Sequence, residues 1–79
     1  MELQPVQIAE QQHLRDLLDS GLITDWSLAI DGGAHLGGWT KIMADRFKRV
    51  ISFEPSEAFD QLRLNCADFT NVRLINAAL

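Results

Sequence analysis

The sequence predicts an α/β fold with a parallel sheet, because it contains three short apolar runs separated by two amphipathic stretches. The apolar runs, residues 27–30, 49–53 and 72–79, have the length of strands. The stretches between them have about a dozen residues each, as expected for helices that link parallel strands. Because such crossovers are right-handed, the strands stack in the order 3-2-1, as in half of a doubly wound, Rossmann-like sheet.

An N-terminal helix is predicted to precede this sheet over residues 6–19, because leucines recur there at helical spacing without strand-like alternation. Gly21 follows and can take the left-handed conformation that closes a helix. The chain is therefore expected to divide into residues 1–25, an acidic helix with its connector, and residues 26–79, a β-α-β-α-β unit.

Composition and charge narrow the class of protein. The 79 residues are 47% hydrophobic and 23% charged, which is typical of one small folded domain. The net charge of −4 belongs to residues 1–26, where Arg15 is outnumbered by acidic side chains, while the later residues balance. Such a chain has no electrostatic footprint for nucleic acid or an anionic membrane. We interpret Arg46, Lys48 and Arg49 as the positively charged end of a helix.

The single cysteine, Cys66, excludes an internal disulfide and a cysteine-rich zinc site. Its place on an apolar helix face predicts a buried small side chain. No apolar run approaches the roughly 18 residues that span a bilayer, and no signal-peptide pattern follows Met1. We therefore expect a cytoplasmic protein without a metal ion.

A glycine-rich turn follows the first predicted strand. Residues 31–40 read Asp-Gly-Gly-Ala-His-Leu-Gly-Gly-Trp-Thr. The glycines permit a tight turn and let a ligand approach backbone N–H groups at the start of a helix. Because α/β sheets bind nucleotides at such turns, the sequence predicts a nucleotide-like ligand. For Trp39 there are two interpretations, covering a bound adenosine or packing within the helix. Its position one helical turn before Met43 favours helix packing.

Asp31 decides between two kinds of nucleotide ligand. A dinucleotide lays a pyrophosphate on this turn, and the Asp31 carboxylate would repel it. The dinucleotide pattern G-x-G-x-x-G also fails at Ala34. The pattern acid-x-G-x-G-x-G instead matches Asp31, Gly33 and Gly37. His35 lies at its middle position, where a positive φ is expected and histidine is tolerated. A ligand with sulfonium and ammonium groups, such as S-adenosylmethionine, is favoured.

Glu54 closes the second predicted strand, 21 residues after Gly33. At about this spacing a carboxylate accepts hydrogen bonds from ribose hydroxyls. Pro55 lacks a backbone N–H and ends the strand, and Ser56 is expected to cap the following helix.

Three ordered blocks resemble the FkbM-type S-adenosylmethionine-dependent methyltransferases: residues 30–40, residues 50–55 with the helix after them, and residues 71–79. The usual first motif of that family is Asp-Val-Gly-Ala-Asn-x-Gly, followed by an aromatic residue and a Ser or Thr. The resemblance covers about residues 26–79 and implies a partial methyltransferase cofactor-binding domain.

By this resemblance, Asp31 and the turn from Gly33 to Gly37 would hold the methionine part of the cofactor, and Glu54 the ribose. Gly32 departs from the motif by replacing an apolar residue, and His35 by replacing an asparagine, and both changes are expected to loosen the turn. The predicted cofactor-binding residues are Asp31, Gly32, Gly33, Ala34, His35, Gly37, Glu54 and Pro55.

The first functional hypothesis is therefore the N-terminal S-adenosylmethionine-binding portion of a methyltransferase, without catalysis of its own, because family members continue into a fourth strand and an acceptor pocket. No catalytic base is identified. The alternative is a non-catalytic α/β module completed by a second copy or a partner chain, since Leu28 and Ile30 would lie on a bare sheet edge. An NAD(P)-binding fragment is the third and weakest hypothesis.

Overall fold

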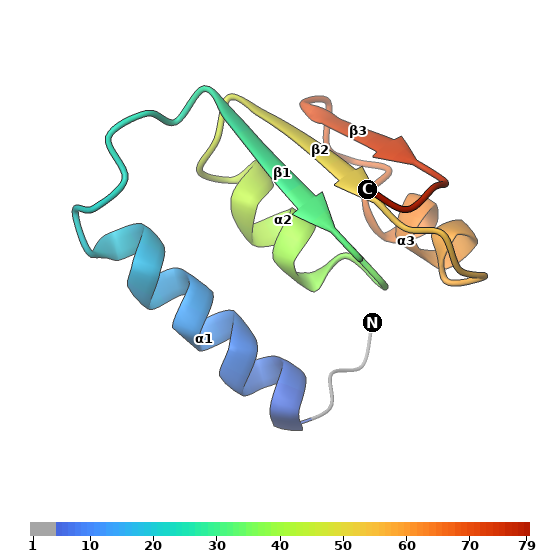
Figure 1. Cartoon of the computed structure of the whole chain (residues 1–79), viewed down its shortest axis with the longest axis horizontal. Helices are drawn as coiled ribbons and strands as arrows, with labels where there is room; N and C mark the ends of the chain where they lie inside the picture. The colour runs from blue at the N-terminus through green and yellow to red at the C-terminus, as the bar shows by residue number, and fades with distance from the viewer. Residues whose placement is uncertain (1–4) are drawn as a thin grey trace.

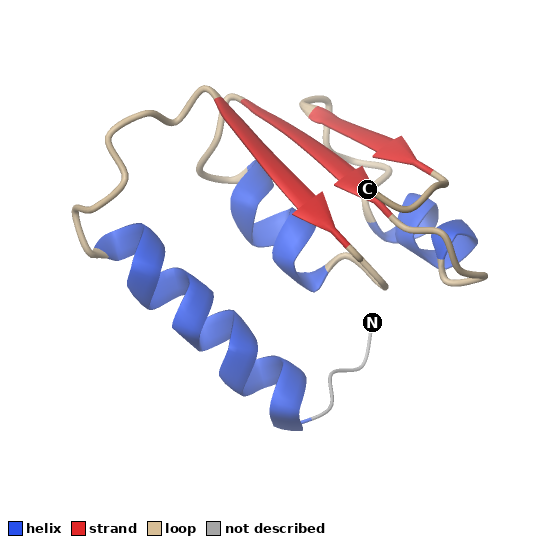
Figure 2. Ribbon diagram, in the orientation of Figure 1, coloured by secondary structure: helices blue, strands red, loops and turns tan. Residues whose placement is uncertain are grey.

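The computed structural model describes residues 5–79 and shows helices and strands in the predicted order (Figures 1 and 2). The elements are α1 (Pro5–Asp19), β1 (Leu28–Gly32), α2 (Gly38–Ala44), β2 (Arg49–Phe53), α3 (Phe59–Asn65) and β3 (Val72–Ile75). The strands are parallel and pair in the order β1-β2-β3, with Val50 opposite both Ala29 and Val72. The predicted half of a doubly wound sheet, in the order 3-2-1 and preceded by a helix, is confirmed.

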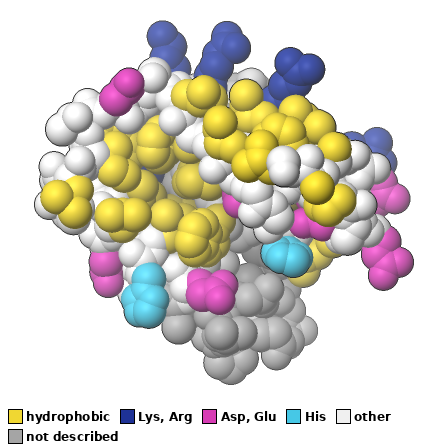
Figure 3. Space-filling view, viewed as in Figure 1, with side chains coloured by type: hydrophobic (Ala, Val, Ile, Leu, Met, Phe, Trp, Pro, Cys, Tyr) yellow, Lys and Arg dark blue, Asp and Glu magenta, His cyan; other side chains and the backbone are white. Residues whose placement is uncertain are grey.

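The three helices lie on the same side of the sheet, and α1 packs beside α2 (Figure 1). Side chains alternate between the two faces of a strand, and those that face the helices are buried. They are Ala29, Asp31, Val50 and Ser52. The opposite face carries Leu28 and Ile30, which are 47% and 54% exposed. Hydrophobic side chains gather on the viewed face in Figure 3. One sheet face is therefore covered, and the other is open.

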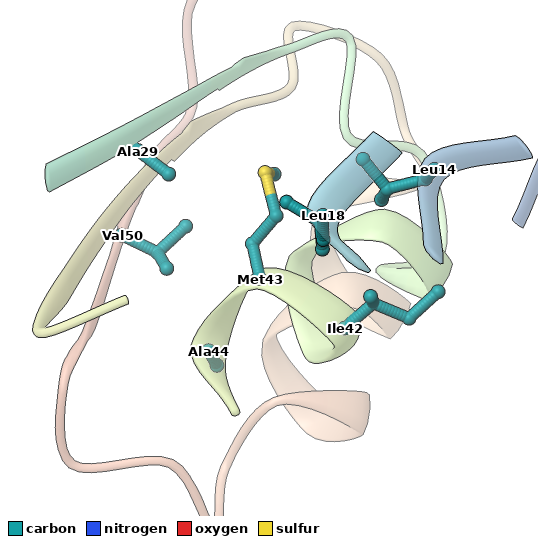
Figure 4. Packing of buried hydrophobic residues seen from close by; sticks show 7 residues of the cluster. All are labelled: Leu14, Leu18, Ala29, Ile42, Met43, Ala44 and Val50. Atoms are coloured by element: carbon teal, nitrogen blue, oxygen red, sulfur yellow. The ribbon is translucent and has the colours of Figure 1, made fainter. Parts of the chain in front are cut away.

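The main core lies between β1, β2, α2 and α1. Its buried members are Leu14, Leu18, Ala29, Ile42, Met43, Ala44 and Val50 (Figure 4). Trp26 and Phe47 pack at its edge, with ring centroids 4.9 Å apart. Since Leu14 and Leu18 come from α1, residues of both predicted parts, 1–25 and 26–79, contribute to this core. Whether each part is a separate domain stays a prediction.

A smaller core lies between the glycine-rich turn and α3. It consists of Ala34, the fully buried Leu62, and Cys66. Cys66 is buried as predicted, and burial raises the pKa of its thiol. A thiol in this setting is a poor nucleophile because its thiolate fraction is small at neutral pH.

α2 ends earlier than its apolar spacing indicates. The N–H groups of Arg46 and Phe47 both bond to the carbonyl of Met43, which closes the helix in a tight turn after Ala44. Arg46 then reaches α1 and forms an ion pair of 2.6 Å with Asp19. Arg46 directly follows the C-cap residue Asp45, whereas Lys48 lies between α2 and β2 and Arg49 begins β2. Of the basic cluster, Arg46 alone therefore lies at a helix end.

Two further local predictions need correction. The third strand ends at Ile75 and not at residue 79, because the N–H of Ala77 turns back to the carbonyl of Ile75. Ser56 does not cap α3, whose N-cap is Ala58. The Ser56 hydroxyl accepts a hydrogen bond from the N–H of Ala58, within the turn that precedes the helix. In the described part of the chain, no helix is long and apolar enough to cross a membrane.

The burial of α1 leucines gives a test of whether this helix folds together with the sheet. Leu18 is 5% exposed in the core, whereas the neighbouring Leu17 is 48% exposed. We expect Leu18→Ala to lower the free energy of unfolding by about 2 to 5 kcal/mol, measured by urea denaturation. Leu17→Ala on the same helix should cost less than about 1 kcal/mol. Equal effects of the two substitutions would contradict a shared core.

Candidate functional site

The glycine-rich turn joins β1 to α2 at the carboxyl end of the sheet. The N–H groups of Gly33 and Ala34 both donate to the carbonyl of Phe53 at 2.9 Å, which fastens the turn to the end of β2. Gly33 has a φ of 75° and His35 a φ of 50°. The positive φ predicted for His35 is therefore confirmed, and a histidine occupies a position that favours glycine.

Gly37 needs to be glycine for two reasons. Its φ is 97°, a conformation that side chains disfavour. A Cβ there would also lie 3.0 Å from both Cys66 Sγ and Leu62 Cδ1. The turn is therefore packed directly on α3, and this close approach fixes where α2 begins.

Asp31 lies under this turn and is 8% exposed. Its Oδ2 accepts a hydrogen bond of 2.9 Å from Thr40 Oγ1, and the Thr40 hydroxyl lies 2.8 Å from Ser52 Oγ. Thr40 and Ser52 are fully buried. Burial raises the pKa of Asp31, while the Thr40 hydrogen bond acts in the opposite direction. A buried carboxylate of this kind gains stability from a nearby cation.

Glu54 also lies at the carboxyl edge of the sheet and is 2% exposed. Its Oε1 accepts the N–H of His35 at 2.8 Å, and its Oε2 accepts both the N–H of Ser56 at 3.0 Å and the Ser56 hydroxyl. The Ser56 hydroxyl, followed by the N–H groups of His35 and Ser56, lowers the pKa of Glu54. Glu54 therefore ties the turn to the end of β2 as a hydrogen-bonded carboxylate.

A pocket of about 270 Å³ opens beside the turn. The predicted residues that line it are Asp31, Gly32, Gly33, Ala34 and His35. The predicted residues outside its lining are Gly37, Glu54 and Pro55. Pockets that hold a whole drug-sized ligand measure roughly 300 to 1,000 Å³. The volume of this pocket lies just below that range.

Several residues of this pocket are not predicted by any pattern in the sequence. Glu10 and Gln11 of α1 line it, and they lie too far along the chain from Asp31 for any local pattern to connect them. Thr40 is outside the lining, but its hydrogen bond to Asp31 is a role that the sequence motif did not predict. The assignment of Trp39 to helix packing is wrong, since Met43 is in the core while Trp39 is 41% exposed and borders the pocket.

The charges around the pocket are acidic. Among the lining residues that the structure describes, Glu10 and Asp31 are carboxylates, His35 is also titratable, and none is a lysine or arginine. Several Lys and Arg side chains stand along the upper edge of the molecule in Figure 3, away from the histidines. Among residues 5–79, no group of three His, Cys, Asp or Glu side chains is arranged to hold a metal ion. The pocket suits a cationic group and disfavours phosphate.

Comparison with known proteins gives matches in structure alone. No protein-family model matches the sequence, and no curated protein matches it either. Trm5b from Pyrococcus abyssi matches 94% of the chain at 17% identity, with a TM-score of 0.73, over 22% of its own length. Phosphoethanolamine N-methyltransferase 1 from Haemonchus contortus, solved with phosphoethanolamine and S-adenosylhomocysteine, matches 86% at 22% identity, with a TM-score of 0.67, over 14% of its length.

The putative methyltransferase SMU.1697c from Streptococcus mutans, solved with S-adenosylhomocysteine, matches 99% of the chain at 25% identity, with a TM-score of 0.69. The match covers 43% of that protein. The chain therefore has a Rossmann-like methyltransferase fold. It spans less than half of the length of each of these three structures.

The lowered pKa of Glu54 predicts acid sensitivity. A depressed pKa contributes stability that is present above the ordinary glutamate value of 4.5 and is lost as the pH falls through the lower value of the folded state. We expect Glu54→Gln to flatten the dependence of unfolding free energy on pH in this acidic range. Glu57→Gln changes an exposed acid between β2 and α3 and is the control. It should leave the dependence of the unfolding free energy on pH unchanged. Parallel curves for Glu54→Gln and the unsubstituted chain would contradict the hydrogen-bonded role of Glu54.

Proposed function

We propose that the chain is the S-adenosylmethionine-binding portion of an FkbM-type methyltransferase. The observation that carries this proposal is the buried Asp31 carboxylate beside the glycine-rich turn, in a pocket whose described lining residues include no lysine or arginine. S-adenosylmethionine carries a sulfonium and an ammonium group, so it complements this charge. Two of the structurally similar methyltransferases were solved with S-adenosylhomocysteine, the demethylated form of that cofactor.

The narrower FkbM assignment rests on the sequence blocks around residues 30–40, 50–55 and 71–79. In this assignment Thr40, which ends the first motif, has a role of its own, because its hydroxyl donates a hydrogen bond to Asp31. A hydroxyl at this position orients the carboxylate, and its hydrogen bond stabilises the buried negative charge. The cytoplasmic location expected from the sequence belongs to the same proposal.

The residues fit the proposed cofactor in two different ways. Asp31, with the backbone of Gly32, Gly33, Ala34 and His35, forms an accessible pocket that suits the methionine end. The cofactor itself supplies the methyl group. Its ribose would be held at the end of β2 by Glu54, as the family resemblance implies, and Pro55 beside it is a further predicted cofactor-binding residue. Glu54 is buried and already accepts three hydrogen bonds, so holding a ribose requires it to exchange at least one of them.

The proposed function is cofactor binding. The chain spans less than half of the structurally similar chains, and the sequence identifies no catalytic base. The proposed organisation is an acidic helix with its connector, residues 1–25, followed by a partial cofactor-binding domain, residues 26–79.

Calorimetric titration with S-adenosylmethionine tests this function. We expect Asp31→Asn, which keeps an acceptor for Thr40 but removes the charge, to weaken binding at least tenfold, or about 1.4 kcal/mol. Asp60→Asn changes an exposed acid of α3 and should bind like the unsubstituted chain. No binding by the unsubstituted chain, or equal binding by Asp31→Asn, contradicts the proposal. Binding of a nicotinamide dinucleotide that improves in Asp31→Asn would favour the NAD(P) hypothesis.

A second candidate function is a non-catalytic module completed by a second copy of the chain, and the free edge of β1 favours it. Arg49 donates to Ser27 and Gly33 donates to Phe53, so the odd-numbered residues of β1 face β2. The N–H and C=O groups of Leu28, Ile30 and Gly32 consequently point away from the sheet. A two-fold axis at Ile30 would pair this edge with itself in antiparallel fashion.

Sedimentation at micromolar concentration tests the second candidate. We expect a dimer that Ile30→Lys converts to a monomer, because a lysine on the open face repels its symmetry mate and opposes edge pairing. Leu64→Lys, on an exposed position of α3, is the matched control. A chain that sediments as a folded monomer without any substitution excludes this candidate.

A further inference from the structure

α1 forms one wall of the pocket beside the glycine-rich turn. Glu10 and Gln11 line the pocket together with residues that follow β1. The helix is held in place farther along its length, by Leu14 and Leu18 in the core and by the ion pair of Asp19 with Arg46. The first part of the chain therefore contributes to the site, beyond its packing role.

The contact that positions this wall is made by Gln11 and Gly38. Gln11 is a polar side chain that is only 7% exposed. A Cβ at residue 38 would collide with the side-chain amide of Gln11, so the glycine leaves the space that this amide occupies. Gly38 has no positive φ that would require glycine for its backbone. Its lack of a side chain is explained by the close approach of α1.

Glu10 adds a second carboxylate to the pocket. Both residues line the pocket, Asp31 as a buried residue of β1 and Glu10 as an exposed residue of α1. No lysine or arginine of the lining neutralises either one. The volume of about 270 Å³ suits an amino-acid moiety, in which a positively charged ammonium is the group that two carboxylates recognise.

We propose that Glu10 is a specificity-determining residue that recognises the ammonium group at the amino-acid end of the ligand, and that Gln11, seated on Gly38, is the positioning residue that holds it there. This inference rests on the proposed function and assigns to α1 a share of its ligand recognition. Because Glu10 is exposed, the solvent screens its charge, and its contribution is that of a surface ion pair.

Comparison of three ligands tests the role of Glu10. S-adenosylmethionine carries an ammonium and a sulfonium, and 5′-methylthioadenosine lacks both. S-adenosylhomocysteine keeps the ammonium without the sulfonium, so Glu10→Gln should weaken its binding by the same factor as that of S-adenosylmethionine. We expect Glu10→Gln to weaken binding of S-adenosylmethionine about three- to fivefold and to leave binding of 5′-methylthioadenosine unchanged. Glu57→Gln, an exposed acid outside the pocket, should change none of these affinities.

The outcomes separate this inference from the proposed function. No binding of S-adenosylmethionine by the unsubstituted chain overturns both. Normal binding by the unsubstituted chain with an unchanged affinity in Glu10→Gln overturns the role of Glu10 alone. An equal loss of affinity for S-adenosylmethionine and 5′-methylthioadenosine also overturns it, because a residue with only a structural role in the pocket wall would affect both ligands equally.

A double-mutant cycle tests the seating of Gln11 on Gly38. Gly38→Ala is expected to displace the Gln11 amide and to weaken binding of S-adenosylmethionine by about the same factor as Glu10→Gln. In a Gln11→Ala background the space is free, so Gly38→Ala should have no further effect on affinity. Additive effects of the two substitutions would overturn the seating. Urea denaturation of the four variants shows whether each is folded, and it applies the same cycle to stability when no ligand is present.

Discussion

The hydrogen bonding of two buried carboxylates at the carboxyl edge of the sheet is the constraint on which the site depends. Asp31 and Glu54 end neighbouring strands and are both almost inaccessible to solvent. A buried carboxylate without hydrogen-bond donors is strongly destabilising, so each must be supplied with them. Thr40 supplies Asp31, and His35 and Ser56 supply Glu54. No buried side-chain polar atom in the described part of the chain lacks a partner.

These donors explain the local geometry. Thr40 reaches Asp31 because α2 begins at Gly38, and the packing of Gly37 on Leu62 and Cys66 determines that start. The N–H of His35 reaches Glu54 while the residue has a positive φ. The positive φ of His35 and the close packing of Gly37 therefore have a common cause. They bring the backbone and side-chain donors within hydrogen-bonding distance of the two acids.

The order of the elements was predictable because it depends on local periodicity and on the handedness of crossovers. The turn at residues 31–40 was predictable because Gly33 and Gly37 are required at fixed positions. Element ends such as Ala44 and Ile75 were not, since they depend on single backbone hydrogen bonds. The contribution of α1 to the pocket could not be predicted from the sequence either. Gln11 contacts Gly38 only because leucines pack α1 into the core, and leucines at helical spacing occur in any amphipathic helix.

The pKa of Asp31 is raised and that of Glu54 is lowered, which indicates different roles for the two acids. Thr40 is the side chain that donates a hydrogen bond to Asp31, whose pKa is raised by burial, so this carboxylate retains acceptor capacity and gains from a cation in the pocket. Glu54 has three donors and a lowered pKa, so it gains little from a further hydroxyl donor unless one of its bonds is exchanged. In the proposed function, a cationic group would therefore gain more at Asp31 than a ribose hydroxyl would gain at Glu54. The proposed contact of Glu54 with a ribose requires the turn and the end of β2 to exchange a hydrogen bond that already joins them.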